Sequence, residues 1–175
     1  IGVHTHDDAG CAVANSIAGV QAGARHVQGT INGYGERCGN ANLCIVIPNV
    51  ELKLKHRALP AGHLPRLHEV ASFVAEVANF APNNQMAYVG NSAFAHKAGV
   101  HVSAMQRHPD AYQHIDPKLV GNQMRVVVSE QSGRANLVSK ADELGLQNLD
   151  PAIGTKVVEL IKEKEHAGYS FEAAE

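Results

Sequence analysis

The stretch IGVHTHDDAG, residues 1–10, decides the fold of this chain because an apolar run opens directly onto two histidines and a glycine turn. The run at 1–3 predicts the end of a buried strand, and residues 11–20 predict a helix packed on it. On an extended segment, side chains at positions i and i+2 point to the same side, so the rings of His4 and His6 can bind one cation. A strand end that opens onto a helix is where α/β folds place their chemistry. We therefore predict a metal site at this point.

A second strand and loop follow the same plan. Residues 25–31 alternate apolar and polar positions, which predicts a short strand. The loop at 32–40 contains three glycines, which let the backbone approach a ligand closely because glycine has no Cβ. A mostly apolar pattern then resumes over 41–54. Two consecutive βα units with polar loops after their strands indicate an α/β fold, a piece of a parallel barrel or of a doubly wound sheet.

The second half of the chain has a different pattern. After a break at residues 60–62, an apolar stripe predicts an amphipathic helix ended by Pro82. The stripe comprises Leu67, Val70, Ala71, Val74, Val77 and Ala78. Shorter elements are predicted downstream: a turn-rich segment at 83–92, helices at 93–105 and 136–144, an extended segment at 126–128, and a helix from Pro151 that Gly168 closes, with Ile153, Val157, Leu160 and Ile161 on its buried face. We therefore place a domain boundary after residue 58, with an accessory, mainly helical subdomain over 59–175.

Composition bounds the function. The chain has 175 residues, of which 45% are hydrophobic and 18% charged, and a formal net charge of −2, so it carries no basic footprint for nucleic acid or a membrane surface. The expected partner is a small molecule or another protein chain. The three cysteines Cys11, Cys38 and Cys44 form no paired framework, which indicates a reducing, cytoplasmic setting. The first residue, Ile1, falls inside an expected strand, so we expect the chain to be a fragment.

Two blocks of sequence carry a family resemblance. Residues 4–10 match a His-x-His-(Asp/Asn)-Asp-x-Gly signature, and residues 30–40, TINGYGERCGN, match a second characteristic block in the right order and spacing. Both resemble the 2-isopropylmalate, homocitrate and citramalate synthases. Segments 94–101, 114–122 and 129–134 resemble the linker subdomains of the same family. The resemblance therefore covers nearly the whole chain.

The resemblance implies a specific fold. The catalytic domain of these synthases is a (β/α)8 TIM barrel, and this chain resembles the last two βα units of that barrel followed by the linker subdomains. The first-strand segment with its aspartate ligand and the C-terminal regulatory domain would then lie outside it. Within the family, residues 33–43 and 165–172 look most like the (R)-citramalate synthases, which act in isoleucine biosynthesis.

The resemblance also implies a reaction. Such enzymes join the methyl carbon of acetyl-CoA to the ketone of a 2-oxo acid, here pyruvate, and then hydrolyse the thioester. The positions that match the family's divalent metal site are His4, His6 and Asn40. Mixed nitrogen and oxygen ligation suits magnesium, manganese or zinc, so the identity of the metal stays open. His101 and Tyr112 match residues thought to take part in proton transfer in the neighbouring subunit, which implies a homodimer. We expect a fragment lacking the first strand to be inactive alone.

Several alternatives stay open. The enzyme could be a 2-isopropylmalate or homocitrate synthase, and Asn40 could be a plain turn residue. Glu36 and Arg37 are interpreted as a structural ion pair rather than as catalysts. A metal-dependent hydrolase with His-x-His on its first strand is disfavoured, because only one further βα unit follows the motif. A non-enzymatic alternative for the isolated chain is a self-associating linker fragment with exposed strand edges.

Overall fold

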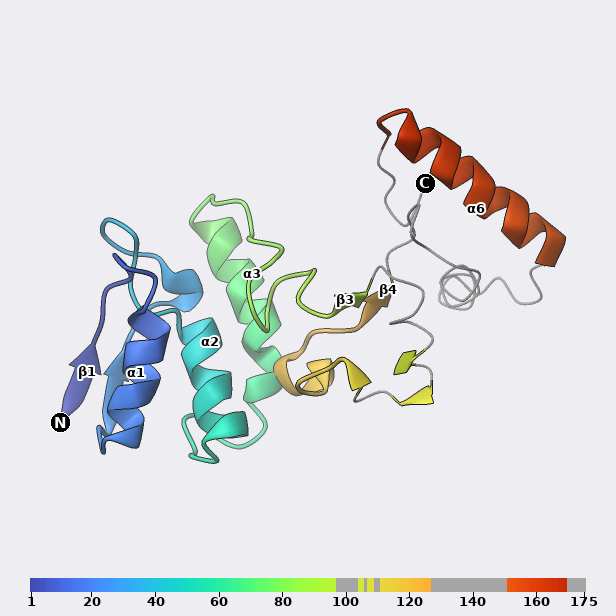
Figure 1. Ribbon diagram of the computed structural model, residues 1–175. Coiled ribbons are helices and arrows are strands. Elements are labelled where there is room, and N and C mark those ends of the chain that lie inside the picture. Colours follow the sequence, from blue (N-terminus) through green and yellow to red (C-terminus); the bar gives the residue numbers. More distant parts are fainter. Residues whose placement is uncertain (97–103, 106, 109–110, 127–150, 170–175) are drawn as a thin grey trace. The chain divides into compact units, whose positions relative to one another are not determined.

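The chain folds into two compact units in a computed structural model (Figure 1). The structure describes residues 1–96, 104–105, 107–108, 111–126 and 151–169. The first unit comprises Ile1–Ala93 with Pro117–Gln123, and the second comprises Phe94–Asp116 with Met124–Glu175. The first compact unit thus extends beyond residue 58. The predicted boundary after residue 58 concerns the division into catalytic and linker domains, and it stays a prediction.

The first unit begins with two βα units, as predicted. Strand β1 (Gly2–His4) pairs in parallel with β2 (His26–Gln28), and helix α1 (Ala12–Gln21) connects them. The register aligns Val3 with Val27 and His4 with Gln28. Because side chains alternate along a strand, the two valines share one face and His4 and Gln28 share the other. This pairing gives both strands a common carboxyl end.

The core of the first unit lies between the helices and the apolar strand face. Helix α2 (Leu43–Pro48) begins where the Asn42 side chain accepts the backbone N–H of Cys44 at 2.9 Å, an N-cap that satisfies a free donor. It continues as a π-turn, η2 (Asn49–Lys53), at Pro48, which lacks an N–H. The buried side chains of the core are Ala12, Ala41, Val46 and Val50, and partly buried Val13, Ile17, Val20, Val27 and Leu43 pack against them.

Helix α3 (Leu67–Val77) starts at the predicted residue and ends before Pro82. Its predicted stripe is partly wrong. The buried positions are Leu67, Ala71 and Ala75, spaced four residues apart, whereas Val77 is 70% exposed. The helix is preceded by a short 3-10 turn, η3 (Leu64–Arg66), which contacts another, η5 (Pro117–Val120). The burial therefore follows the small alanines, which let α3 pack closely.

The second unit contains β3 (Ala95–His96), β4 (Arg125–Val126) and α6 (Pro151–His166), with β3 and β4 paired in parallel. The helix expected over 93–105 is wrong at its start, because Ala95–His96 pair with a distant segment; Ala104 and Met105 are helical. The extended segment expected at 126–128 is confirmed at Val126, whereas 127–128 and the helix expected at 136–144 lie outside the described residues.

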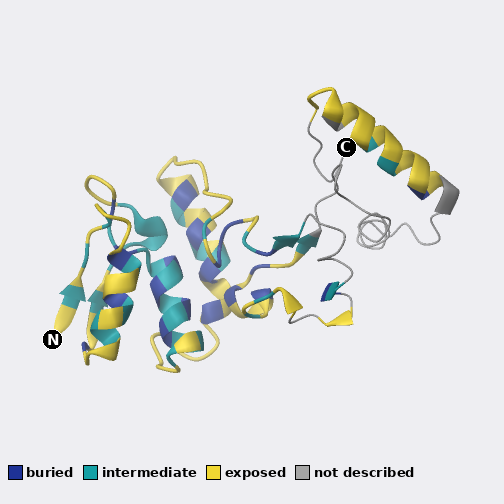
Figure 2. Ribbon diagram, in the orientation of Figure 1, coloured by how far each residue is buried: buried dark blue, intermediate teal, exposed yellow. Residues whose placement is uncertain are grey.

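Helix α6 begins at Pro151, as predicted, and Gly168 follows its end with φ +92°. The predicted buried face is wrong at three of its four positions: Ile153, Val157 and Leu160 are exposed, as Figure 2 shows for most of the helix, whereas Ile161 is half-buried. Among the described residues, no helix has the length and apolar character needed to cross a membrane.

Candidate metal centre

The loops that follow β1 and β2 lie side by side and are joined by backbone hydrogen bonds. The N–H of Asp7 donates to the carbonyl of Gly39 at 2.9 Å, and the N–H of Ala41 donates to the carbonyl of Thr5 at 3.0 Å. His6 and Asn40 form an isolated antiparallel bridge between the same loops. The loop after β1 is thereby fixed against the loop after β2 at the carboxyl end of the strands.

The rings of His4 and His6 converge at this end of the strands, as predicted. Their Nε2 atoms are 3.3 Å apart, and their ring centroids are 5.1 Å apart at an interplanar angle of 58°. If each Nε2 ligated one ion at about 2.0–2.1 Å, a separation of 3.3 Å would give an N–metal–N angle of about 107°, close to tetrahedral. The pair therefore has the spacing that a shared cation requires.

Gln28 orients the first of these rings. Its Oε1 lies 3.1 Å from His4 Nδ1, across the β1–β2 pairing. Because an amide oxygen accepts, His4 Nδ1 carries the hydrogen and the Nε2 lone pair is left to face the neighbouring ring. In known metal sites, a ligating histidine commonly donates its other ring N–H to an acceptor, which fixes the orientation of the ring. Sequence reasoning missed Gln28, although strand register could have found it.

Asn40 pairs with His6 through the backbone bridge, and its side-chain oxygen is the candidate third ligand. Its Oδ1 is buried and has no hydrogen-bond partner among the described residues, while its Nδ2 donates to the Tyr34 carbonyl at 3.4 Å. A buried acceptor without a partner is costly, and an amide oxygen is an ordinary ligand of hard cations. The donor set of two imidazoles and one amide therefore fits a divalent metal. In the described part of the chain no third His, Cys, Asp or Glu joins the group.

Glycines shape the loop around Asn40. A Cβ on Gly35 would lie 2.4 Å from Asn40 Nδ2, and one on Gly39 would lie 2.1 Å from the Gly33 carbonyl oxygen. Gly39 also has φ +98°, in the left-handed region that favours glycine. These glycines allow close packing within the loop itself. The predicted close approach of the backbone to a ligand stays a prediction.

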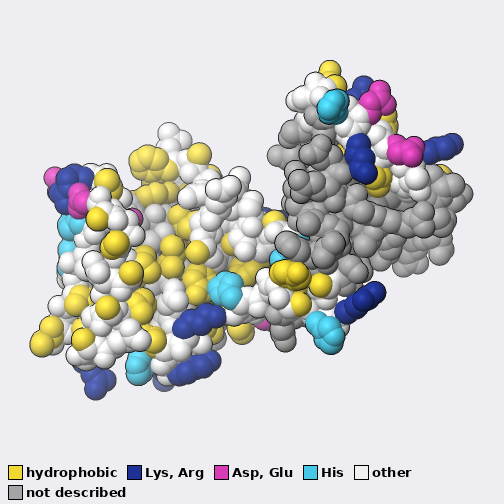
Figure 3. All heavy atoms as spheres, viewed as in Figure 1, with side chains coloured by type: hydrophobic (Ala, Val, Ile, Leu, Met, Phe, Trp, Pro, Cys, Tyr) yellow, Lys and Arg dark blue, Asp and Glu magenta, His cyan; other side chains and the backbone are white. Residues whose placement is uncertain are grey.

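Arg37 pairs with a residue of the other loop. Its Nε and Nη2 donate to Asp8 Oδ1 and Oδ2 at 2.6 and 3.0 Å, whereas the expected pair with Glu36 is longer, at 3.8 Å. The hydrogen bond from Arg37 lowers the pKa of Asp8, and the same bond raises the pKa of Arg37. Figure 3 shows acidic, basic and histidine side chains gathered over these loops.

The two residues expected to transfer protons are His101 and Tyr112. His101 lies outside the described residues, and Tyr112 belongs to the second unit, where its side chain is 49% exposed. Both roles stay predictions.

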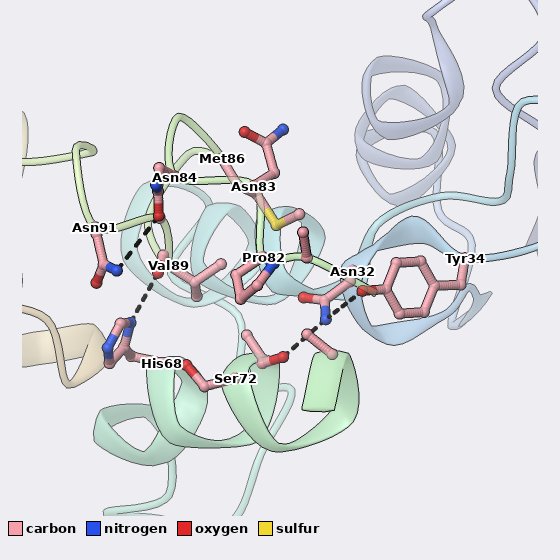
Figure 4. Close-up of a pocket in the computed structure, with 14 residues that line it drawn as sticks. Asn32, Tyr34, His68, Ser72, Pro82, Asn83, Asn84, Met86, Val89 and Asn91 are labelled. Carbon is pink, nitrogen blue, oxygen red and sulfur yellow. Dashed lines mark hydrogen bonds between the residues drawn. The ribbon is translucent and has the colours of Figure 1, made fainter. Parts of the chain in front are cut away.

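A cavity of about 210 Å³ lies in the first unit, between α3 and the loops at 32–34 and 81–91 (Figure 4). Asn32 forms one wall, with its Nδ2 donating to the Ala71 carbonyl at 2.8 Å, and His68 forms another, with Nδ1 at 2.7 Å from the Val89 carbonyl. Of the residues that the structure describes, no Asp, Glu, Lys or Arg lines the cavity. Behind Asn32, burial raises the pKa of the Cys44 thiol. Sequence reasoning found no signal for this cavity, because its walls come from segments far apart in the chain.

The chain matches two family models and is similar in sequence to several known proteins. Residues 1–74 match the HMGL-like family model, and residues 88–168 match the homocitrate synthase post-HMGL domain-like model. The chain is 54% identical over its full length to an (R)-citramalate synthase of Geobacter sulfurreducens and 52% identical to one of Synechocystis sp., covering 33% and 32% of those proteins. It is 39% identical to a 2-isopropylmalate synthase of Sulfolobus acidocaldarius, covering 45% of that protein. The chain thus spans about a third of the length of the citramalate synthases that it matches.

Proposed function

We propose that the whole protein is an (R)-citramalate synthase, because residues 1–74 match the HMGL-like family model and residues 88–168 match the homocitrate synthase post-HMGL domain-like model. It would condense acetyl-CoA with pyruvate in isoleucine biosynthesis. The observation that carries this choice is the higher identity to (R)-citramalate synthases than to the homocitrate and 2-isopropylmalate synthases. The spacing of His4 and His6 supports the metal dependence of the reaction.

The HMGL-like family is a TIM-barrel family, and the β1–α1–β2–α2 segment is an α/β piece of that kind. We infer that these are the last two βα units of the barrel. Active sites of such barrels lie at the carboxyl ends of the strands, which is where the loops carrying His6 and Asn40 meet. The order of the two family matches along the chain agrees with this placement.

The residues on these loops would hold and orient the metal. His4 and His6 would ligate through Nε2, Asn40 would ligate through its unpartnered Oδ1, and Gln28 would hold the His4 ring. When bound, the divalent ion would polarise the ketone of the 2-oxo acid and stabilise the alkoxide that forms as the new C–C bond is made. The identity of the metal, magnesium, manganese or zinc, stays open.

A base must also take a proton from the methyl group of acetyl-CoA. We propose that His101 and Tyr112 act in this proton transfer and that they do so from the neighbouring subunit of a homodimer. The expected result is a His101→Ala enzyme that binds pyruvate and metal as before but has lost nearly all turnover.

Light-scattering mass determination of the full-length protein tests the proposed homodimer. A monomer with full activity would contradict it.

The function is tested with a panel of 2-oxo acids on the full-length protein. Thiol release from acetyl-CoA is measured with pyruvate, 2-oxoisovalerate and 2-oxoglutarate, before and after removal of metal by a chelator. We expect pyruvate to give the highest kcat/KM and the chelator to abolish activity. A preference for 2-oxoisovalerate would identify a 2-isopropylmalate synthase instead, and a preference for 2-oxoglutarate a homocitrate synthase. A cytoplasmic location remains a prediction.

A further inference from the structure

We propose that Asp8 and Arg37 form a clamp that positions His6 and Asn40 for metal binding, an inference that rests on the proposed metal-dependent function. Neither residue is a ligand in the proposed site. Each lies close in sequence to one: Asp8 is two residues after His6, and Arg37 is three residues before Asn40. The pair therefore joins the two loops that carry these ligands.

The geometry of the pair is that of a specific contact. Arg37 donates from two different nitrogens to the two oxygens of one carboxylate, at 2.6 and 3.0 Å. Such a bidentate pair fixes direction as well as distance, because the guanidinium is planar and its donors form a rigid fork. The partners are 29 residues apart in sequence, so the contact restrains one loop relative to the other.

The clamp closes a ring of contacts around the ligands. Asp7 donates its backbone N–H to the Gly39 carbonyl at 2.9 Å, and its Oδ1 accepts the N–H of Ala12 at 2.9 Å. Asp7 thus links the start of α1 to the loop after β2. The bridge between His6 and Asn40 lies next to this bond. The Asp8–Arg37 pair completes the ring on the exposed side, where no backbone hydrogen bond between the loops is present among the described residues.

The backbone of Arg37 supports a role for its side chain. Its φ of +58° lies in the left-handed region, which glycine and asparagine adopt more readily than arginine. If the loop needed only this turn, glycine would serve without strain. A strained residue at a functional loop indicates that its side chain contributes something the turn alone does not. Here that contribution is the contact with Asp8.

The side chains of Arg37 and Asp8 are 53% and 47% exposed. Water and salt weaken a pair in this setting, so its contribution to global stability is small. The expected consequence is local: without the clamp, the loop that carries Asn40 samples positions in which the amide oxygen and the imidazoles no longer face one ion. Metal affinity is therefore the quantity that the clamp changes.

The test measures Mn²⁺ and Zn²⁺ binding to the full-length protein by isothermal titration calorimetry. We expect Arg37→Ala to weaken binding about three- to tenfold, less than the roughly 10- to 100-fold loss that follows removal of a direct hydrogen-bond partner of a ligand, because Arg37 acts through the loop. Arg37→Lys should give an intermediate value, because a lysine cannot make the bidentate contact. Asp8→Asn combined with Arg37→Ala should be no weaker than the worse single variant, as expected of one shared interaction.

Two control variants separate the effect of the clamp from the loss of a surface charge and from a change in the turn. Arg66→Ala removes another exposed ion pair, with Glu69 at 3.4 Å, and should leave metal affinity unchanged. Arg37→Gly suits the left-handed backbone but removes the side chain, so it should bind metal as weakly as Arg37→Ala while its thermal unfolding midpoint stays at or above that of the wild type.

The outcomes distinguish this inference from the function on which it rests. If His4→Ala abolishes metal binding but Arg37→Ala and Arg37→Gly both bind within twofold of the wild type, the clamp is overturned and the metal centre stands. If Arg37→Gly alone restores wild-type affinity, position 37 serves the turn and not the pair, which also overturns the clamp. If the wild type binds neither ion, or if His4→Ala binds as the wild type does, the proposed metal centre itself fails.

Discussion

Asn40 presents the most direct test of the metal centre at the scale of a single residue. Its buried Oδ1 has no partner in the described structure, whereas its Nδ2 has one, so the oxygen is the candidate ligand atom. We expect Asn40→Ala to weaken Mn²⁺ binding by the full-length protein about tenfold or more. Asn40→Asp should retain or increase affinity, because a carboxylate is a stronger ligand for a hard cation.

The matched control for this change is Asn91→Ala, which removes an amide that lines the cavity and does not lie on the Asn40 loop. Its Mn²⁺ affinity, measured by the same titration, should equal that of the wild type. Equal affinities for Asn40→Ala and the wild type would show that Asn40 only shapes the turn, the alternative that the sequence left open.

Gln28 gives a second prediction at this scale. Gln28→Leu keeps much of the side-chain volume but removes the acceptor 3.1 Å from His4 Nδ1. The His4 ring is then free to rotate and to carry its hydrogen on Nε2, so metal binding should weaken about tenfold. Gln28→Glu should bind at least as tightly as the wild type, because a carboxylate accepts the same bond. Gln21→Leu, at the exposed end of α1, is the control and should not change affinity.

Sequence reasoning reached part of this site and not the rest. His4 and His6 could be predicted together because residues two apart on a strand share a face, and the measured 3.3 Å between their Nε2 atoms confirms their convergence. Gln28 and Asp8 were missed as partners because each contact joins segments more than twenty residues apart. Local periodicity contains no information about such pairs. Strand register and loop pairing, which the structure supplies, are needed to find them.

At the scale of elements, the loop between β2 and α2 depends on glycine at position 39. Gly39→Ala would place a Cβ 2.1 Å from the Gly33 carbonyl oxygen and force a left-handed φ on alanine. We expect the thermal unfolding midpoint to fall, with a cost of about 1–3 kcal/mol from the strained backbone alone. Mn²⁺ affinity should fall as well, because Gly39 accepts the Asp7 N–H beside the ligands.

Gly62→Ala is the matched control for Gly39→Ala. Gly62 has φ +80°, but a Cβ there would meet no atom of the described residues within 4 Å. This variant should lose some stability from the backbone conformation and keep its metal affinity. A Gly39→Ala protein with the midpoint and the affinity of the Gly62→Ala protein would contradict the role given to the loop.

The helices and strands were predictable to different degrees for a physical reason. The observed α1 (Ala12–Gln21) and the start of α3 follow local apolar patterns, and α6 starts at the predicted Pro151. The buried face of α3 was predicted correctly at Leu67 and Ala71, but the packing buries Ala75 in place of the larger Val77. Strand β3 has two residues and exists only through its pairing with Arg125–Val126, so no local pattern could predict it.

At the scale of the complete protein, the described chain supplies two imidazoles and an amide at the end of a two-stranded parallel sheet. A closed barrel of the TIM type needs eight strands, and the citramalate synthases that this chain matches are about three times its length. Two parallel strands cannot enclose a substrate, exclude water or add a carboxylate ligand to the metal. The proposed activity would therefore depend on parts of the full-length protein outside these 175 residues.

This dependence predicts that a polypeptide limited to residues 1–175 will not catalyse the condensation. Purified with Mn²⁺ or Zn²⁺, it should release no thiol from acetyl-CoA in the presence of pyruvate, under conditions in which the full-length protein does. Its Mn²⁺ affinity should also be much lower than that of the full-length protein, because fewer ligands hold the ion. Adding a separately produced N-terminal part of the barrel should restore some of both properties if the missing strands supply the remaining ligands. Thiol release by residues 1–175 alone, at a rate near that of the full-length protein, would contradict the view that His4, His6 and Asn40 form only part of the centre.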